Sequence, residues 1–215
     1  MAIETKICGV NSVAALDAAV AGGADMIGLN FYPPSPRYLP PGQAAALARR
    51  APPGLLKVAL LVDPDDALLE GILAQVPLDM LQLHGAEAPR RVAEVRGRFG
   101  LPVMKAVKIA EAGDFDAAEP YLDVADRLLF DAKAPKHMTD ALPGGNAVAF
   151  DWRLLAGRSW PRPWMLSGGL DPDNLAEAVE ISGARAVDVS SGVEDKPGVK
   201  SPQKIAAFLE TARGL

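Results

Sequence analysis

Two side chains that exchange protons readily stand at the ends of apolar runs in this sequence. Cys8, the only cysteine among 215 residues, ends the run "IETKIC" (3–8), and Asp131 lies near the end of "RLLFDA" (127–132). A thiolate base and a carboxylic acid together suit proton transfer to and from a substrate. Each residue also has a purely structural interpretation. Free cysteine is among the most buried residue types, and a carboxyl group in this position can serve simply as a hydrogen-bonding group.

Other polar side chains accompany comparable runs. Arg37, in "PSPRY", lies between prolines that restrict its loop, so it suits bidentate binding of a carboxylate, although an exposed solubilising charge is an equal alternative. His84, in "QLHG", is either a ligand contact or a satisfied polar group. Lys6 shares one side of its strand with Cys8, where it either lowers the pKa of the thiol or remains a charge in the core or in solvent. The further candidates at predicted strand ends are Asn30, Asp63, Lys105 or Lys108, Ser167 and Asp188.

Two glycine-rich turns give the strongest local signal. They are "LSGGLDPDN" (166–174) and "VDVSSGVED" (187–195), and each follows a predicted strand. Small residues and glycine expose backbone amides and allow a ligand to approach closely, which is typical of phosphate sites. Glycine turns are also needed after strands for structural reasons alone. Because two such turns are adjacent, we expect a ligand that carries a phosphate group.

The spacing of the apolar runs predicts the elements that position these residues. Eight runs start at intervals of 22 to 36 residues, which is the length that a strand, a helix and two short loops require. The runs are 3–8, 26–31, 57–62, 79–84, 102–107, 127–132, 163–168 and 186–191.

The stretches between these runs have helical spacing. Val13, Leu16 and Val20 follow Asn11, which we expect to cap a helix that ends at Gly22 and Gly23. Asp63 is expected to cap the helix after the third run, and Asp171 with Pro172 to start the helix after the seventh. Apolar strands that alternate with amphipathic helices predict a parallel sheet, closed here as a (β/α)8 TIM barrel that forms one domain over residues 1–215. The alternative, an open doubly wound sheet, usually has G-x-G-x-x-G after its first strand, and "CGVNSV" does not match it.

Two longer intervals place loops on the functional face of this barrel. If the helices are of similar length throughout, the extra residues lie in the loops 32–42 and 133–147, and loops that follow barrel strands line the active site. Strands 1 and 6 are three apart in a ring of eight, so Cys8 and Asp131 are expected to face each other across the mouth. A phosphate held after strands 7 and 8 would lie between them. This layout is typical of a sugar-phosphate isomerase that uses no cofactor.

Composition excludes several other classes. The formal net charge of −5 argues against general binding of nucleic acids or anionic membranes. A single cysteine forms no internal disulfide, and two histidines without a Cys/His cluster predict no metal site. The first residues, "MAIETKICGV", lack an apolar signal core, and no run approaches the ~20 apolar residues that span a bilayer. We therefore expect a cytoplasmic protein.

Taken in order, seven stretches resemble the phosphoribosylanthranilate isomerase family of tryptophan biosynthesis. They are "TKICGV", "GADMIGLNFYPPSPRY", "LQLHG", "LLFDA", "PGGNAVAFDW", "LSGGLDPDN" and "VDVSSGVEDKPGVKSPQKI". The resemblance implies a (β/α)8 barrel that catalyses an Amadori rearrangement of N-(5-phosphoribosyl)anthranilate, without a cofactor, as a monomer or homodimer.

The resemblance also implies roles for individual residues. Cys8 would be the general base and Asp131 the general acid, which requires a lowered pKa for the thiol and a raised pKa for the carboxyl group. Arg37 would bind the anthranilate carboxylate, and His84 and Asp188 would contact the substrate. The phosphate would be held by amides of the last two strand ends, at Gly168, Gly169, Ser190, Ser191 and Gly192.

One departure and three alternatives accompany this hypothesis. The family usually has "GGTG" or "GGSG" after strand 6, whereas this chain has Asn146-Ala147 after the two glycines, which leaves the conformation of that loop open. A histidine-pathway aminoaldose isomerase would have an acid in place of Cys8, and a ribulose-phosphate epimerase would need histidine ligands for a metal. The third alternative is a barrel that binds phosphate without catalysis.

Overall fold

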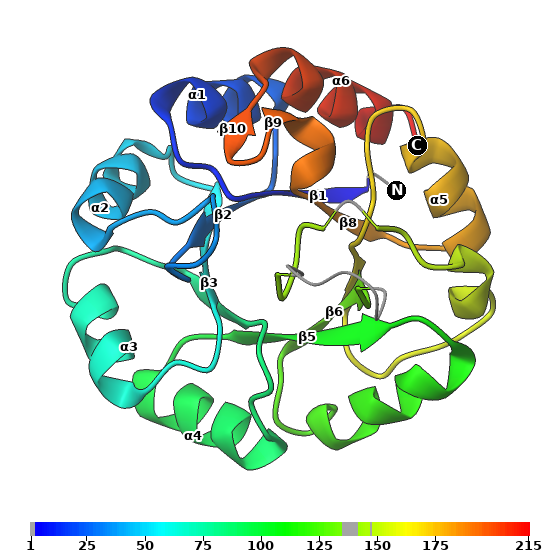
Figure 1. The fold of residues 1–215 in the computed structure, drawn as a ribbon, viewed down its shortest axis with the longest axis horizontal. Helices are drawn as coiled ribbons and strands as arrows, with labels where there is room; N and C mark the ends of the chain where they lie inside the picture. Colours follow the sequence, from blue (N-terminus) through cyan, green and yellow to red (C-terminus); the bar gives the residue numbers. More distant parts are fainter. Residues whose placement is uncertain (1–2, 135–141, 147) are drawn as a thin grey trace.

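The computed structural model describes residues 3–134, 142–146 and 148–215, and these form a closed barrel of eight parallel strands surrounded by helices (Figure 1). The order of the strands around the barrel is their order in the chain. The strands are β1 (Glu4–Cys8), β2 (Met26–Asn30), β3 (Leu56–Leu61), β4 (Met80–Leu83), β5 (Val103–Ile109), β6 (Arg127–Ala132), β7 (Trp164–Leu166) and β8 (Ala186–Val189). The predicted (β/α)8 barrel is confirmed.

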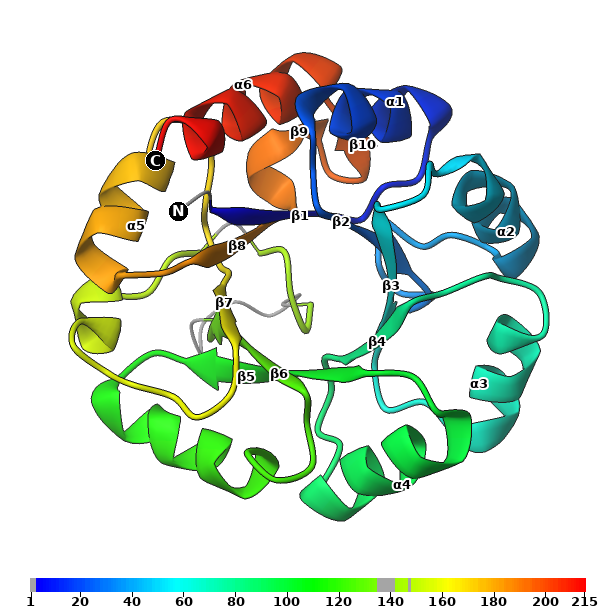
Figure 2. The same cartoon turned by 180° about the vertical axis from the view of Figure 1, so that it is seen from behind.

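The helices form a ring outside the strands, as both views of the barrel show (Figures 1 and 2). The first and last of them, α1 and α6, lie side by side and close this ring. Their close approach depends on Gly22, because a Cβ atom there would lie 2.3 Å from Leu209 Cδ1. The helices are α1 (Val13–Gly22), α2 (Pro41–Arg50), α3 (Asp66–Leu73), α4 (Pro89–Phe99), α5 (Leu175–Ser182) and α6 (Pro202–Arg213).

The prediction of similar helices after every strand is wrong at two places. After β5 the chain forms the 3₁₀ helix η1 (Ala112–Tyr121), which contains Pro120. Proline has no N–H to continue an α-helical pattern. After β6 the described residues contain only the short 3₁₀ helix η2 (Trp152–Leu155). The described residues of the long interval before β7 are therefore mostly loop. Within the described ranges, no helix is long and apolar enough to cross a membrane.

The start of α1 differs from the prediction. Ser12 caps this helix by accepting a hydrogen bond from the Ala15 amide, whereas Asn11 donates to the Gly198 carbonyl oxygen at 2.9 Å. Val13 is 48% exposed, so it does not belong to the buried face. Small residues and one leucine make up that face, which consists of Ala15, Leu16 and Ala19. Gly23, which follows the helix, has the left-handed φ of 75° expected of a terminating glycine.

One other predicted cap is displaced. Asp65, not Asp63, caps α3, because its side chain accepts from the Leu68 amide at 2.8 Å. Asp63 has a φ of 45° and accepts instead from the Ala86 amide after β4. The regular part of α5 begins at Leu175, but the Asp171 carboxylate accepts from the amides of Asp173 and Asn174, and its carbonyl oxygen accepts from the Leu175 amide. These are the bonds of an N-cap, as predicted for Asp171.

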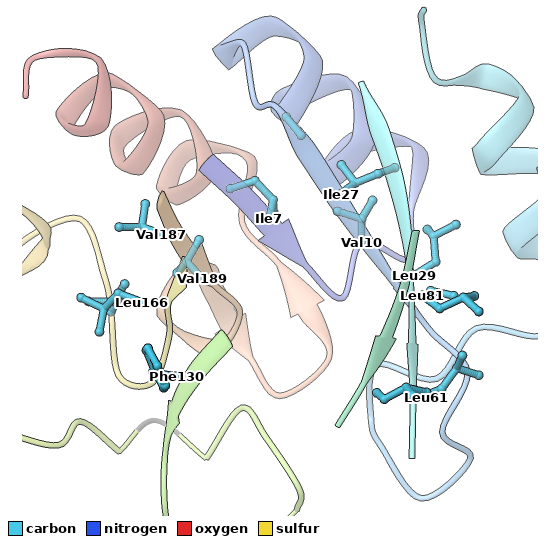
Figure 3. Packing of buried hydrophobic residues seen from close by; sticks show 14 of the residues in the cluster. Ile7, Val10, Ile27, Leu29, Leu61, Leu81, Phe130, Leu166, Val187 and Val189 are labelled. Carbon is cyan, nitrogen blue, oxygen red and sulfur yellow. The ribbon is translucent and has the colours of Figure 1, made fainter. Parts of the chain in front are cut away.

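Alternation along the strands divides the core into two parts. Outward-facing residues pack against the helices and form the larger apolar cluster, of which Figure 3 shows a part, including Ile7, Leu61 and Phe130. The inward-facing residues nearer the strand starts form a separate apolar floor: Met26, Val58, Met80, Met104, Ala106, Leu129, Met165 and Ala186. The next inward positions along the strands carry polar groups, so the polar layer lies toward the carboxyl ends, where barrel enzymes hold their sites.

Candidate active site

A pocket lies at the carboxyl ends of the strands. Nine of the ten predicted site residues line it, although they come from distant parts of the chain. These are Cys8, Arg37, His84, Asp131, Gly168, Gly169, Asp188, Ser190 and Ser191. Gly192, the tenth, does not line the pocket. It packs against the loop after β7, where a Cβ atom would lie 1.9 Å from the Leu170 carbonyl oxygen.

Cys8 ends β1 on the inward side of the barrel, beside Gly28 of β2. A Cβ atom on Gly28 would lie 2.9 Å from Cys8 Sγ and 3.3 Å from Lys6 Nζ, so glycine makes room for both groups. Burial raises the pKa of the Cys8 thiol, and the nearby Lys6 opposes this effect without overcoming it. Desolvation therefore exceeds the attraction of the ammonium group, and a thiolate base at Cys8 requires a lower pKa than these surroundings favour.

Lys6 lies beneath Cys8 as half of a buried ion pair. Its Nζ atom donates to Asp188 Oδ1 at 2.7 Å, and Ser167 Oγ donates to Oδ2 at 3.0 Å. Burial alone would lower the pKa of Lys6, but Asp188 and Cys8 outweigh it and raise that pKa. Lys6 is thus a paired core charge that also acts electrostatically on the thiol, which combines two of the interpretations left open above.

Asp131 lies near the end of β6, beside two polar groups on the other side of the mouth. Its Oδ2 atom accepts from Lys108 Nζ at 2.9 Å and lies 3.0 Å from His84 Nε2. Burial alone would raise the pKa of this carboxyl group, but Lys108 and His84 outweigh it and hold the pKa well below the ordinary value. A general acid at Asp131 requires a higher pKa than these two neighbours favour.

His84 is held in a defined orientation by Gln82, which precedes it on the inward face of β4. Gln82 Nε2 lies 2.8 Å from His84 Nδ1. When this amide donates, Nδ1 accepts, and the proton of the neutral ring stands on Nε2 and points to Asp131. Burial and Lys108 lower the pKa of His84, so the neutral ring predominates at pH 7.

The choice between the two lysines of β5 is settled by the alternation of side chains. Lys108 shares the inward face with Met104 and Ala106 and pairs in register with Asp131. Lys105 points outward, where its Nζ atom donates to Glu87 Oε2 at 2.7 Å. The period of two was visible in the sequence and could have selected Lys108.

Arg37 is carried by the loop after β2 and is buried at the rim of the pocket. Its Nε and Nη2 atoms donate to the two carboxylate oxygens of Glu194, at 2.7 and 2.9 Å, and Nη2 also donates to the Gly145 carbonyl oxygen. Lys200 Nζ donates to Glu194 Oε1 at 2.8 Å. Within the described part of the chain, Arg37 Nη1 has no hydrogen-bond partner, so the guanidinium retains donors for a ligand.

Glu194 is a site residue that sequence reasoning missed. It begins β9 (Glu194–Lys196), which pairs with β10 (Val199–Lys200) in a hairpin after β8. Burial alone would raise the pKa of Glu194, but Arg37 and Lys200 hold it below the ordinary value. A signal existed in "SGVED", where an acid follows a phosphate-type turn, but its partner is 157 residues away.

The two glycine-rich turns approach other backbone segments closely. Gly168 and Gly169 have φ values of 91° and 68°, and Cβ atoms there would lie 2.6 Å from the Ala132 and Ala149 nitrogens respectively. Glycine is therefore required at both positions. Within the described ranges, no hydrogen bond engages the amides of Gly168, Gly169, Ser190 and Ser191. Four amides at adjacent turns on one pocket form an arrangement suited to an anion.

The loop after β6 covers the acid side of the mouth. A Cβ atom on Gly144 would lie 2.8 Å from His84 Nε2 and 3.2 Å from Asp131 Oδ2, so the backbone packs directly on these groups. Asn146 stabilises the turn by bonding both to the Leu142 amide and to the Leu142 carbonyl oxygen. Ala147, the other residue of the departure noted above, lies outside the described residues.

A closed parallel barrel with its pocket at the carboxyl ends of the strands defines the class of (β/α)8-barrel enzymes. The sequence profile of the family described as "N-(5'phosphoribosyl)anthranilate (PRA) isomerase" matches residues 5–211, and the chain belongs to this family. The N-(5'-phosphoribosyl)anthranilate isomerase of Paramagnetospirillum magneticum is 59% identical, over 100% of this chain and 99% of the relative.

Solved structures agree with this assignment. Phosphoribosyl anthranilate isomerase from Thermotoga maritima superposes with a TM-score of 0.88 and 34% identity, covering 99% of this chain and 100% of the other. A further phosphoribosyl anthranilate isomerase, in complex with reduced 1-(o-carboxyphenylamino)-1-deoxyribulose 5-phosphate, has a TM-score of 0.83 and 31% identity, with coverage of 99% and 100%.

Proposed function

We infer that this protein isomerises N-(5'-phosphoribosyl)anthranilate to 1-(2-carboxyphenylamino)-1-deoxyribulose 5-phosphate, an Amadori rearrangement in tryptophan biosynthesis. The observation that carries this conclusion is that a member of the isomerase family gathers Cys8 and Asp131 on one pocket with a row of available amides. A thiol and a carboxyl group supply the base and the acid that the reaction requires. The reaction exchanges only protons and needs no cofactor.

In the first proposed step, Asp131 in its acid form protonates the ring oxygen of the ribose. The bond between C1 and that oxygen breaks, and the nitrogen lone pair forms the C1=N bond of a protonated Schiff base. Asp131 Oδ1 is the atom suited to this transfer. The contacts of this carboxyl group with Lys108 and His84 both involve Oδ2, and Oδ1 has no partner among the described residues.

In the second proposed step, Cys8 as thiolate removes the proton from C2 of the sugar. The C–H electrons form a C1=C2 bond and the C=N electrons return to nitrogen, which gives an enolamine that tautomerises to the ketone. The enzyme is left with a neutral thiol and an anionic carboxylate. These are the forms that the raised pKa of Cys8 and the lowered pKa of Asp131 favour in the empty pocket.

The proposed binding mode anchors both ends of the substrate. Amides of Gly168, Gly169, Ser190 and Ser191 suit the 5'-phosphate, and Gly192 supports this turn from behind. Arg37 Nη1 suits the anthranilate carboxylate. His84 and Asp188 lie between these ends and are proposed to contact the sugar.

The inference is tested by adding purified protein to freshly prepared N-(5'-phosphoribosyl)anthranilate and following the loss of anthranilate-type fluorescence. We expect decay far faster than the spontaneous rate, with the ribulose phosphate as product. Decay at the spontaneous rate, with phosphate binding retained, would instead identify a non-catalytic phosphate-binding barrel. Turnover of a different aminoaldose alone would identify another isomerase of this class.

We also infer that the protein works in the cytoplasm as a monomer or homodimer, with its phosphosugar substrate as its partner. Light scattering across a range of protein concentrations tests the oligomeric state. A mass above that of two chains would contradict the inference.

A further inference from the structure

Lys108 is the cationic partner of the proposed acid within the described residues. It pairs in register with Asp131 across the β5–β6 ladder, and its Nζ atom donates to Asp131 Oδ2 at 2.9 Å. Its Nζ atom also lies 3.0 Å from His84 Nε2. If the proton of the neutral ring is on Nε2, as the contact with Gln82 indicates, Lys108 makes its hydrogen bond with Asp131.

Among the residues that the structure describes, the other groups near Asp131 carry no net positive charge. His84, after β4, is neutral because burial and Lys108 lower its pKa. Gly144, from the loop after β6, packs on the carboxyl group, and Ser167, after β7, lines the same pocket. The thiol of Cys8 and the pair of Asp188 with Lys6 belong to β1 and β8 across the mouth. The positive charge bonded to the acid is therefore that of Lys108.

The position of Lys108 separates it from the substrate. Its side chain is 30% exposed, and the residue is absent from the lining of the pocket, whereas Asp131 is buried and lines it. Lys108 thus holds the acid from the solvent edge, and it acts on the pocket through Asp131 and through His84, whose pKa it lowers.

We propose that Lys108 is a positioning residue for the acid: it holds the Asp131 carboxyl by Oδ2, leaves Oδ1 toward the substrate, and keeps the carboxyl anionic while the pocket is empty. The role of Lys108 in the reaction rests on the proposed function, whereas its effect on the Asp131 carboxyl group in the substrate-free protein does not. The lowered pKa of Asp131, which Lys108 reinforces against the effect of burial, agrees with the proposal.

The direct test is the titration of Asp131 by ¹³C NMR of aspartate side-chain carboxyl carbons in the substrate-free protein, with the signal assigned by its loss in Asp131→Asn. In the wild type, we expect the carboxyl to stay ionised to the lowest pH at which the barrel is folded. In Lys108→Met, which keeps an apolar stem, the midpoint should rise by about 1–3 pH units, the usual effect of one adjacent opposite charge.

Two matched variants serve as controls, one that keeps the positive charge at position 108 and one that removes a different lysine near Asp131. Lys108→Arg keeps the cation and should keep Asp131 ionised. Lys133→Met removes a lysine two residues after Asp131, one that is 53% exposed and pairs with Asp114 instead. It should leave the Asp131 titration unchanged. A carboxyl that titrates at the same pH in Lys108→Met and in the wild type would overturn the proposal.

Kinetics supply a second readout that a merely structural role would not move. The rate requires protonated Asp131 together with Cys8 thiolate, so kcat/KM rises with pH and levels off near the pKa of the acid. In Lys108→Met, the pH at which kcat/KM becomes constant should be higher than in the wild type. If kcat/KM falls by the same factor at every pH and becomes constant at the same pH as in the wild type, Lys108 only supports the fold.

The outcomes also separate this proposal from the proposed function. If the wild type fails to isomerise the substrate, the proposed function is wrong, and the NMR titration still decides how Lys108 acts on Asp131. If turnover occurs and the titration midpoints coincide, the proposed function stands and the role of Lys108 is wrong.

Discussion

The two sides of the barrel mouth are built alike but arrange their charges differently. On one side, Lys6 of β1 pairs with Asp188 of β8, and the reactive thiol of Cys8 lies beside this pair. On the other, Lys108 of β5 pairs with Asp131 of β6, and here the reactive group is itself half of the pair. Both lysines bond an aspartate on the neighbouring strand in register.

This difference in charge pairing determines which protonation state Cys8 and Asp131 each favour. Cys8 is close to a cation whose charge is already balanced by Asp188, so burial dominates and the pKa of the thiol is raised. Asp131 receives the full attraction of its cation, so its pKa is lowered despite burial. The same pairing of lysine with aspartate on neighbouring strands thus leaves the pKa of Cys8 raised and the pKa of Asp131 lowered. In the proposed mechanism, substrate binding has to overcome both preferences before the first proton moves.

The largest expected effect comes from removing either reactive group. Cys8→Ser and Asp131→Asn should each lower kcat by about 10²–10⁴-fold, because each removes one half of the acid–base pair. Steady-state fluorescence assays measure this, with inorganic phosphate binding as a check that the pocket is intact. A Cys8→Ser enzyme with near-normal kcat would return the thiol to a packing role.

Stability should distinguish the two lysines. Lys6→Met leaves Asp188 charged and buried without its partner, and the free energy of unfolding should fall by about 3–5 kcal/mol. Lys108→Met should cost less than half of that, because Lys108 is partly exposed and His84 still contacts Asp131. Urea unfolding at pH 7 measures both, and equal losses would contradict the comparison.

The pH dependence of the Lys108→Met loss has a defined sign. A carboxyl group whose pKa is lowered by folding stabilises the protein above its unfolded pKa of about 3.9, and this contribution is lost as the pH falls through the folded pKa. The difference between Lys108→Met and the wild type should therefore be full at pH 7 and shrink below about pH 4. A difference that grows on acidification would show that Lys108 stabilises something other than the Asp131 carboxylate.

Arg37 belongs to neither side and should affect binding instead of proton transfer. Arg37→Ala should raise KM by about 10–100-fold with little change in kcat, the usual range for a hydrogen bond to a charged group. Arg50→Ala is the matched control, because Arg50 makes a similar two-bond contact with Asp17 on the exposed surface. An unchanged KM in Arg37→Ala would exclude the carboxylate role.

The smallest effect concerns the thiol in the native protein. An ordinary thiol has a pKa of about 8.5, and Cys8 should show this value in the urea-unfolded chain. Because burial raises the pKa of Cys8 in the native protein, the rate of its alkylation by iodoacetamide should there reach half of its plateau above about pH 8.5. The single cysteine makes the mass-spectrometric readout unambiguous. A native midpoint below that of the unfolded chain would reverse the comparison.

Much of this architecture was predictable from local patterns. Apolar runs at regular intervals predicted all eight strands, and β6 has the bounds that the sequence indicated. Helix starts were less predictable, because Asn11 and Asp63 compete with the neighbouring Ser12 and Asp65 for the same role. Only the packed neighbours decide between them, since Asn11 bonds to Gly198 and Asp63 to the turn after β4.

The candidate site was likewise predictable only in part. Residue types and their places at strand ends brought Cys8, Asp131 and the glycine turns together correctly in one pocket. The partnership of Arg37 with Glu194 was not predictable, because it joins loops that only the closed barrel brings into contact. The pKa directions of Cys8 and Asp131 were not predictable, because they depend on a balance of burial and nearby charge that spacing alone does not reveal.

The contact of Arg37 with Glu194 and Gly145 has a consequence for affinity. An arginine side chain carries about 2 kcal/mol of rotamer entropy, and in this protein most of it is lost when the chain folds. A carboxylate bound by Arg37, as proposed, would meet a preorganised guanidinium and would not bear that ordering cost. The proposed recognition of the carboxylate would in this way depend on Glu194, a residue absent from the lining of the main pocket.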